Sequence, residues 1–381
     1  VSGSIAASGP IGSVSATEGD LDVTVTTTTD FGTVGELTAG RDLILETSIS
    51  QGIGLLQAGR NIGRPGEAGM IFTSGSLESL VAAGHLYTDI RVGGVLTSAS
   101  IGPAINRPGS PMALSGSFYV AGRIETIEIA GDFGGSITSF TDGIASVVIN
   151  NGSLLNTGRI ATYDGNVESV VINSGNLYGD IYSAWDINSV VLNPSADGIF
   201  GDIGINPGLS GGVGYDAFRG QVPPGTLPTS GKDGPVIAAD RNIESIVVAG
   251  GAVFEATIYA GRVLVSVDIT GSVRSDATPE NTGRTTFAAG DTIESIVVSG
   301  NMDFAQIIAG VRSLGDDMAA GGYGTDTDTN QAGSITSIAV GGNMTNTAVA
   351  AGMDAGSDRI YNTDDDLLEI GSSSIGTISI G

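Results

Sequence analysis

The densest group of residues that could bind a metal lies near the C-terminus of the sequence. Its oxygen-bearing members are Asp354, Asp358, Asn362, Asp364 and Asp366, all within thirteen residues. Carboxylate and amide oxygens gathered in a loop are the ligands that Ca²⁺ prefers. The three consecutive Asp residues at 364–366 would repel one another without a cation between them. We therefore expect a structural calcium site here, and the alternative is a set of solvated loop acids.

Two shorter acidic segments resemble this one in composition. Asp326, Asp328 and Asn330 have the first, third and fifth spacing of a helix-loop-helix calcium loop. The Gly at the sixth position and the Glu at the twelfth position of that loop are missing, so the motif is not met. The segment from Asp197 to Asp202 is a shorter relative of the C-terminal loop. For both segments we expect solvated surface acids.

The rest of the composition excludes most catalytic chemistry. The chain has 381 residues and no Cys, one His (His85) and one Lys (Lys232), so thiolate and His-cluster sites are absent from the sequence. The formal charge of −26 repels nucleic acid and anionic lipid and attracts divalent cations. We expect His85 to be an ordinary surface residue and Trp185 a core or corner filler. The chain is not expected to be an enzyme, although paired carboxylates for polysaccharide cleavage stay an open alternative.

A repeat explains how such side chains are positioned. The pattern apolar, any residue, Ser or Thr, apolar, any residue, apolar recurs along the chain, and in most copies a Gly follows two residues later. Its clear copies begin at Leu77, Ile124, Ile144, Val167, Ile187, Ile243, Leu264, Ile293, Ile335 and Ile375, and a weaker copy begins at Ile11. The closest starts are 20 to 23 residues apart, and intervals of 40, 42 and 47 residues indicate skipped turns.

A unit of about 20 residues with β-branched runs and Gly corners predicts a β-solenoid. Parallel coils would stack about 4.8 Å apart, with the first, fourth and sixth motif residues pointing inward. The Ser or Thr would hydrogen-bond backbone groups that the ladder leaves free, and Gly would supply a positive φ at the corner. The Glu at the second position would form an outward charged stripe: Glu78, Glu125, Glu168, Glu244 and Glu294. A leucine-rich repeat is the alternative, but Leu is rare in the motif and no segment has a helical composition.

The whole chain is expected to form one domain, a single β-solenoid over residues 1–381. Residues 1–75 would form less regular coils, with one longer strand near 21–30, and residues 76–381 the regular repeats. Long surface loops are expected near 206–235, 274–286 and 314–333, where Pro and Gly are frequent or the periodicity stops.

The two ends of the sequence suggest a processed or excised segment that assembles. The chain starts at Val1 without a leader, and it stops on a complete motif that has no polar cap after it. No apolar run of about 18 residues is present, so membrane insertion is not expected. An uncapped coil would belong to a longer rod or would dock on another subunit.

The motif strands, the Gly-Asn-Met turns at 300–302 and 342–344, the Ala-Gly corners and the 354–366 loop resemble large repetitive β-helix surface proteins of bacteria, of the planctomycete type. The resemblance covers about residues 76–381. It implies a right-handed parallel β-helix displayed outside the cell, with a structural or adhesive role and no catalytic residue.

Together these observations predict an all-β, right-handed parallel β-helix with coils of about 20 residues and loop insertions. Its expected function is extracellular and structural: a calcium-stabilised unit at the bacterial cell surface that self-assembles into a filament, sheath or surface layer. Its expected partner is a second copy of itself, joined end to end or laterally. The alternative is an adhesin or a polysaccharide-binding or polysaccharide-cleaving β-helix with a carbohydrate groove.

Overall fold

The computed structural model describes residues 1–28, 32–67, 69–102, 116–194, 235–275, 285–313, 329–354, 367–368 and 372–381. Every regular element in these ranges is a β-strand, and the long sheets are parallel, so the predicted all-β solenoid is confirmed. The chain divides into two compact units, Val1–Val171 and Ile172–Gly381. The predictions of one continuous solenoid and of a right-handed coil stay predictions.

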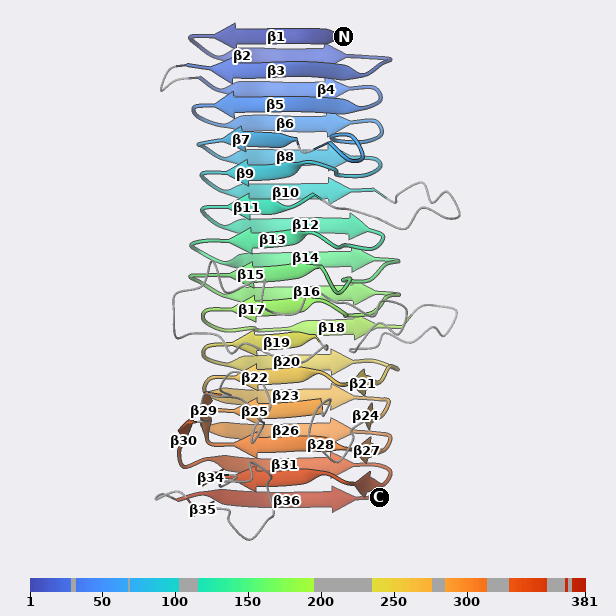
Figure 1. Cartoon of the computed structure of the whole chain (residues 1–381), viewed down its shortest axis with the longest axis vertical. Coiled ribbons are helices and arrows are strands. Elements are labelled where there is room, and N and C mark those ends of the chain that lie inside the picture. The colour runs from blue at the N-terminus through green and yellow to red at the C-terminus, as the bar shows by residue number, and fades with distance from the viewer. Residues whose placement is uncertain are drawn as a thin grey trace. The chain divides into compact units, whose positions relative to one another are not determined.

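In the first unit each coil contributes one strand to each of two parallel sheets (Figure 1). Sheet A has the order β1 (Ser2–Ala7), β3 (Leu21–Thr27), β5 (Leu43–Ile49), β7 (Met70–Thr73), β9 (Asp89–Val92), β11 (Phe118–Val120), β13 (Ser136–Ser139) and β15 (Arg159–Thr162). Sheet B has the order β2 (Ile11–Ala16), β4 (Val34–Ala39), β6 (Ile53–Ala58), β8 (Leu77–Ala82), β10 (Leu96–Ile101), β12 (Ile124–Ala130), β14 (Ile144–Asn150) and β16 (Val167–Asn173).

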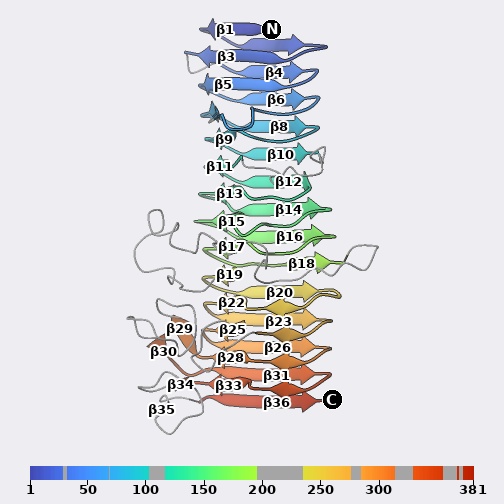
Figure 2. The same ribbon diagram turned by 45° about the vertical axis from the view of Figure 1, so that its right-hand side comes forward.

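The second unit has the same arrangement (Figure 2). Its part of sheet A has the order β17 (Asp180–Ser183), β19 (Val236–Ala239), β22 (Thr257–Ala260), β25 (Thr285–Ala289), β28 (Ala305–Ala309) and β33 (Ala348–Ala351). Its part of sheet B has the order β18 (Val190–Asn193), β20 (Ile243–Val248), β23 (Val263–Ile269), β26 (Thr292–Val298), β31 (Ser334–Val340) and β36 (Ser374–Ile380).

Among the described residues there are three smaller sheets, all in the second unit. Short parallel strands at one corner form sheet C: β21 (Val253–Phe254), β24 (Val273–Arg274), β27 (Met302–Asp303) and β32 (Met344–Thr345). Two antiparallel ribbons pair β29 (Val311–Ser313) with β30 (Thr329–Asn330), and β34 (Met353–Asp354) with β35 (Leu367–Leu368).

The repeated motif forms the strands of sheet B, and its inward positions form half of the core. In β12 the first, fourth and sixth motif residues, Ile124, Ile127 and Ile129, are fully buried, whereas Glu128 between the last two is exposed. The same stations align in neighbouring coils, where Ile127 pairs with Ala99 on one side and with Val147 on the other. Like apolar residues therefore stack in rows along the coils, as predicted.

The structure corrects the number of coils. The 47-residue interval contains a motif strand that we missed, β10, which begins at Leu96 and has Ala99 at its fourth position. The intervals of 42 and 40 residues contain no skipped turn, because β26 pairs directly with β31 and β31 directly with β36. Each of these intervals is one coil with an insertion. The strands β4 and β6 in residues 1–75 keep the same register as β8.

The expected loops are shorter than predicted where they can be described. Arg274 ends β24 and Thr285 begins β25, so the loop predicted at 274–286 starts and ends inside strands. Thr329–Asn330 form β30, within the loop predicted at 314–333. Residues 206–234 of the first predicted loop lie outside the described residues. The period-two run predicted near 21–30 is confirmed as a strand over Leu21–Thr27.

The outer face of sheet A changes along the chain. It is open at β7, where Met70 and Phe72 are 42 % and 36 % exposed, but it is already buried at β13 and β15 of the first unit, where Thr138 and Ala161 are 4 % and 0 % exposed. In the second unit both faces are buried, and all residues of β19, β22, β25 and β28 have exposures of 9 % or less. Parallel strands buried on both faces have apolar runs without alternation, and Val236–Ala239 is such a run. Among the described residues there is no helix, and thus none that could span a membrane.

Candidate functional site

The predicted calcium loop can be placed only at its first residue. Asp354 ends β34, and its backbone pairs with Leu367 of β35, so the two ends of the 355–366 segment lie side by side. Asp358, Asn362, Asp364 and Asp366 lie outside the described residues, as do Asp326, Asp328, Asp197 and Asp202. In the described ranges no group of three or more acidic or histidine side chains is placed to hold a metal ion.

The predicted glutamate stripe is present on the outer face of sheet B, and it has a period of two coils. At the second motif position, consecutive coils of the first unit carry Glu78, Thr97, Glu125, Ala145 and Glu168. The glutamates therefore stand about 10 Å apart, twice the coil spacing, which is beyond the Debye length of about 8 Å at physiological salt. The outward stripe thus avoids direct repulsion between neighbouring coils.

One arginine connects two of these glutamates. The Arg123 guanidinium lies 3.0 Å from a carboxylate oxygen of Glu125 in its own coil, and 2.8 Å from one of Glu168, two coils further on. In the second unit the same alternation recurs as Glu244, Val265, Glu294 and Thr336 in β20, β23, β26 and β31.

The Ser or Thr at the third motif position serves the backbone in two of the described coils, as predicted. Neighbouring motif strands pair at positions one and three to six, but not at position two. The backbone carbonyl of the second residue therefore lacks a partner in the ladder. The hydroxyl of the third position in the next coil supplies one: Ser98 donates to the Glu78 carbonyl at 3.2 Å, and Ser337 donates to the Glu294 carbonyl at 3.1 Å. These side chains are therefore structural.

Corner acids in the first unit also serve the backbone. The Asp20 carboxylate accepts a hydrogen bond from the backbone N–H of Asp42 at 3.2 Å. In the next coils the Asp42 carboxylate accepts one from the Asn61 N–H at 3.2 Å, and the Asn61 side-chain oxygen accepts one from the His85 N–H at 2.9 Å. Burial raises the pKa of Asp42, but hydrogen bonds from Arg60 and Asn61 outweigh it and hold this pKa below its ordinary value.

The His85 ring stacks on the Tyr87 ring, with 5.1 Å between the ring centres, and burial lowers the pKa of His85. His85 is thus half-buried and not the ordinary surface residue we expected.

The aromatic side chains gather on sheet A and its corners. On the outer face of sheet A, Phe72, Arg91 and Tyr119 follow one another on adjacent coils, and the Arg91 guanidinium lies 5.5 Å from the centre of the Tyr119 ring. At the next corner the rings of Phe140 and Tyr163 stack at 5.4 Å. None of the described strands of sheet B contains Phe, Tyr or Trp. The two faces are therefore chemically distinct.

An acid with a strongly raised pKa lies at a corner of the second unit, which we call the Asp240 corner: Tyr182, Trp185, Asp240 and Arg241. Burial raises the pKa of Asp240 to about 6, although the Tyr182 hydroxyl donates to its Oδ2 at 3.0 Å. Trp185 is 40 % exposed, so it is no core residue, and the Arg241 guanidinium lies 4.5 Å from its ring centre. Acids with strongly perturbed pKa values are common in functional sites. This acid carries no signal in the sequence, because the burial that raises its pKa comes from tertiary packing.

The raised pKa of Asp240 predicts a pH-dependent stability. The folded state holds the proton more tightly than the unfolded chain does, so the stabilisation is complete below pH 4 and is lost as the pH rises through about 6. Asp240→Asn can still accept from the Tyr182 hydroxyl without the buried charge. Because solvent weakens the effect at this half-buried position, we expect a gain of about 1 kcal/mol at pH 7.5.

Urea unfolding at pH 4.5 and at pH 7.5 measures this effect. Asp268→Asn makes the same change of charge on the exposed face of β23 and serves as the control. A stabilisation by Asp240→Asn that is equal at both pH values would contradict the assignment.

Within each unit the coils stack in register on parallel sheets, and this arrangement defines the class of the protein: it is a parallel β-solenoid. Comparisons with family models, with curated proteins and with solved structures gave no match.

Proposed function

We propose that the chain is an extracellular structural protein, an acidic β-solenoid that self-assembles into a filament, sheath or surface layer at the bacterial cell surface. The observation that supports this proposal most is the common register of the motif strands. From β2 to β14, and again from β20 to β36, neighbours pair through the same five motif positions. The free edge of any motif strand is therefore a template for another.

The strand β36 shows what such an edge exposes. Ile375, Ile378 and Ile380 are 43 %, 41 % and 55 % exposed, whereas the equivalent residues of the paired strand β31 are 1–2 % exposed. A further motif strand beside β36 would bury these isoleucines, whether further chain or a second copy supplies it. Burial of apolar area of this kind is the main driving force of association.

Sedimentation velocity over a wide range of protein concentration tests self-assembly. We expect the wild type to form larger species as its concentration rises, and Ile378→Asp to abolish them. Val297→Asp is the matched control, because Val297 is an outward residue of β26 with 37 % exposure that lies away from the edge. A wild type that stays monomeric throughout, or equal loss of association in both variants, would overturn the proposal of edge-to-edge assembly.

We also propose that Ca²⁺ stabilises this protein through Asp354, Asp358, Asn362, Asp364 and Asp366. Ligand binding to the folded state alone raises the unfolding midpoint. We expect thermal unfolding to occur a few degrees higher in calcium than in EGTA, and the double variant Asp364→Asn, Asp366→Asn to remove the difference. An unchanged wild-type midpoint after chelation would contradict the site.

A second candidate function is carbohydrate binding, as an adhesin or a polysaccharide-active β-helix. The row of Phe72, Arg91 and Tyr119 favours it, because aromatic rings on one outer face, two coils apart with an arginine between them, suit the apolar faces and hydroxyls of sugars. Pull-down with insoluble polysaccharides distinguishes this function: Phe72→Ala with Tyr119→Ala should release the protein if it binds there, and should leave self-assembly unchanged.

A further inference from the structure

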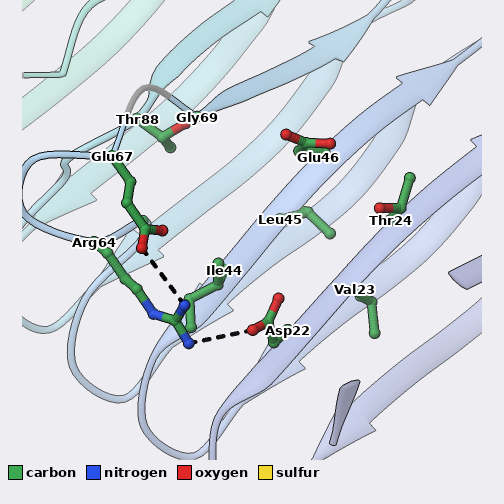
Figure 3. A pocket seen from close by; sticks show the side chains of 11 residues that line it. Asp22, Val23, Thr24, Ile44, Leu45, Glu46, Arg64, Glu67, Gly69 and Thr88 are labelled. Carbon is green, nitrogen blue, oxygen red and sulfur yellow. Dashed lines mark hydrogen bonds and ion pairs between the residues drawn. The ribbon is translucent and has the colours of Figure 1, made fainter. Parts of the chain in front are cut away.

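A cavity of about 260 Å³ lies on the outer face of sheet A in the first unit, beside the first half of β5 (Figure 3). It exists because β7 is short. β5 begins at Leu43, but it pairs with β7 only from Thr47 onward. The chain leaves the ladder after the Gly63 N–H donates to the Leu43 carbonyl at 2.8 Å, and Pro65 has no N–H to continue it.

The charges around this cavity do not balance. Its lining contains three carboxylates, Asp22, Glu46 and Glu67, but one guanidinium, Arg64. Arg64 lies 3.2 Å from Asp22 and 3.7 Å from Glu67, and both point toward it (Figure 3). Glu46 lies on the other side of the cavity and has no ion pair with any described residue. Three negative charges against one positive charge leave a site that attracts cations.

A buried hydroxyl provides an independent indication of a ligand. Thr88 lines the cavity and is 2 % exposed, and its Oγ1 has no hydrogen-bond partner among the described residues. Buried polar groups without a partner are rare and call for an explanation. Gly69 lines the same end of the cavity and approaches this hydroxyl closely, since a Cβ there would lie 2.7 Å from the Thr88 Oγ1. A polar group of a bound molecule would complete the hydrogen bonding of Thr88.

We propose that this cavity binds a small organic ammonium compound. An ammonium group carries the positive charge that would balance the Glu46 carboxylate. Its three N–H groups can donate hydrogen bonds to carboxylate and hydroxyl oxygens. A second polar group on the same molecule reaches Thr88. The cavity has the volume of about nine waters, which suits a diamine or an amino sugar. Anions are repelled, because Arg64 is already shared by Asp22 and Glu67.

Isothermal titration calorimetry with two matched probes tests this proposal. D-glucosamine and D-glucose differ in one amino group, and putrescine supplies ammonium groups without a sugar ring. Below neutral pH we expect both amines to bind and glucose to bind at least tenfold more weakly. Glu46→Gln should weaken amine binding about tenfold, and Thr88→Val should weaken it severalfold.

Glu36→Gln is the control variant, because it removes an exposed carboxylate from β4 of sheet B in the same unit. It should leave amine binding unchanged. Absence of binding by both amines, equal binding of glucosamine and glucose, or a Glu46→Gln variant that binds like the wild type would overturn the proposal. Circular dichroism of each variant confirms that the coils remain folded.

Discussion

Replacing Ile127 by Ala is expected to lower the free energy of unfolding of the first unit by about 2–5 kcal/mol, the range for truncating a large buried aliphatic side chain. Ile127 is fully buried at the fourth motif position of β12. It stacks in register between Ala99 and Val147, so the cavity left behind would be lined by both neighbouring coils. Because each coil contacts only its neighbours, the loss would weaken two interfaces at once.

Urea unfolding followed by circular dichroism measures this loss. Ser100→Ala changes an exposed, outward residue of the paired strand β10 and should alter the stability by less than about 0.5 kcal/mol. If the two variants were equally stable, the inward assignment of the fourth position would be wrong.

Replacing Gly75 by Ala is expected to destabilise the first unit by about 2–3 kcal/mol, the upper range for overpacking. A Cβ at Gly75 would lie 1.8 Å from the Gln51 carbonyl oxygen, a backbone atom of the preceding coil. A backbone atom cannot rotate away as a side chain can, so the two coils would have to separate locally and lose ladder hydrogen bonds.

Gly19→Ala is the matched control, since it lies in a corner of the same unit and a Cβ there would meet nothing within 4 Å. This control should be neutral or slightly stabilising, because Ala restricts the unfolded chain. Thermal unfolding of the two variants in parallel would show the contrast, and equal midpoints would refute the role of close coil approach at Gly75.

The fold could be predicted from the sequence because one pattern repeats. Positions one, four and six of the motif are apolar in nearly every copy, and their burial follows directly from that pattern. The coil at Leu96 was missed because Ala99 replaces a larger apolar residue. The 40- and 42-residue intervals were misread because an insertion and a degenerate coil have the same effect on spacing.

The reason for the corner glycines was only partly predictable. Gly131 and Gly250 have φ of 122° and 89°, as expected for a turn that needs a positive φ. At Gly271 the need is space, since a Cβ would lie 1.8 Å from the Gly251 carbonyl oxygen of the preceding coil. Such a contact depends on the distance between coils, which a single sequence does not contain.

The candidate sites were less accessible to sequence reasoning than the fold. The Asp240 corner joins residues from two coils that are more than 50 positions apart in the sequence, and burial decides its protonation. The cavity beside β5 arises because residues 44–46 of β5 have no strand partner in the following coil, and the motif carries no signal for it. An aromatic residue or an Arg outside the motif is the clearest sequence signal for such places.

The alternation of glutamate along sheet B restricts how this solenoid can change its length. Loss of the coil that carries Ala145 would bring Glu125 and Glu168 onto adjacent coils, about 4.8 Å apart, where screening by salt is weak. Duplication of a single coil that carries a glutamate would likewise place two glutamates on adjacent coils. Gain or loss of two coils preserves the spacing and leaves Arg123 able to bridge its partners. The unit of evolutionary growth compatible with this face is therefore a pair of coils.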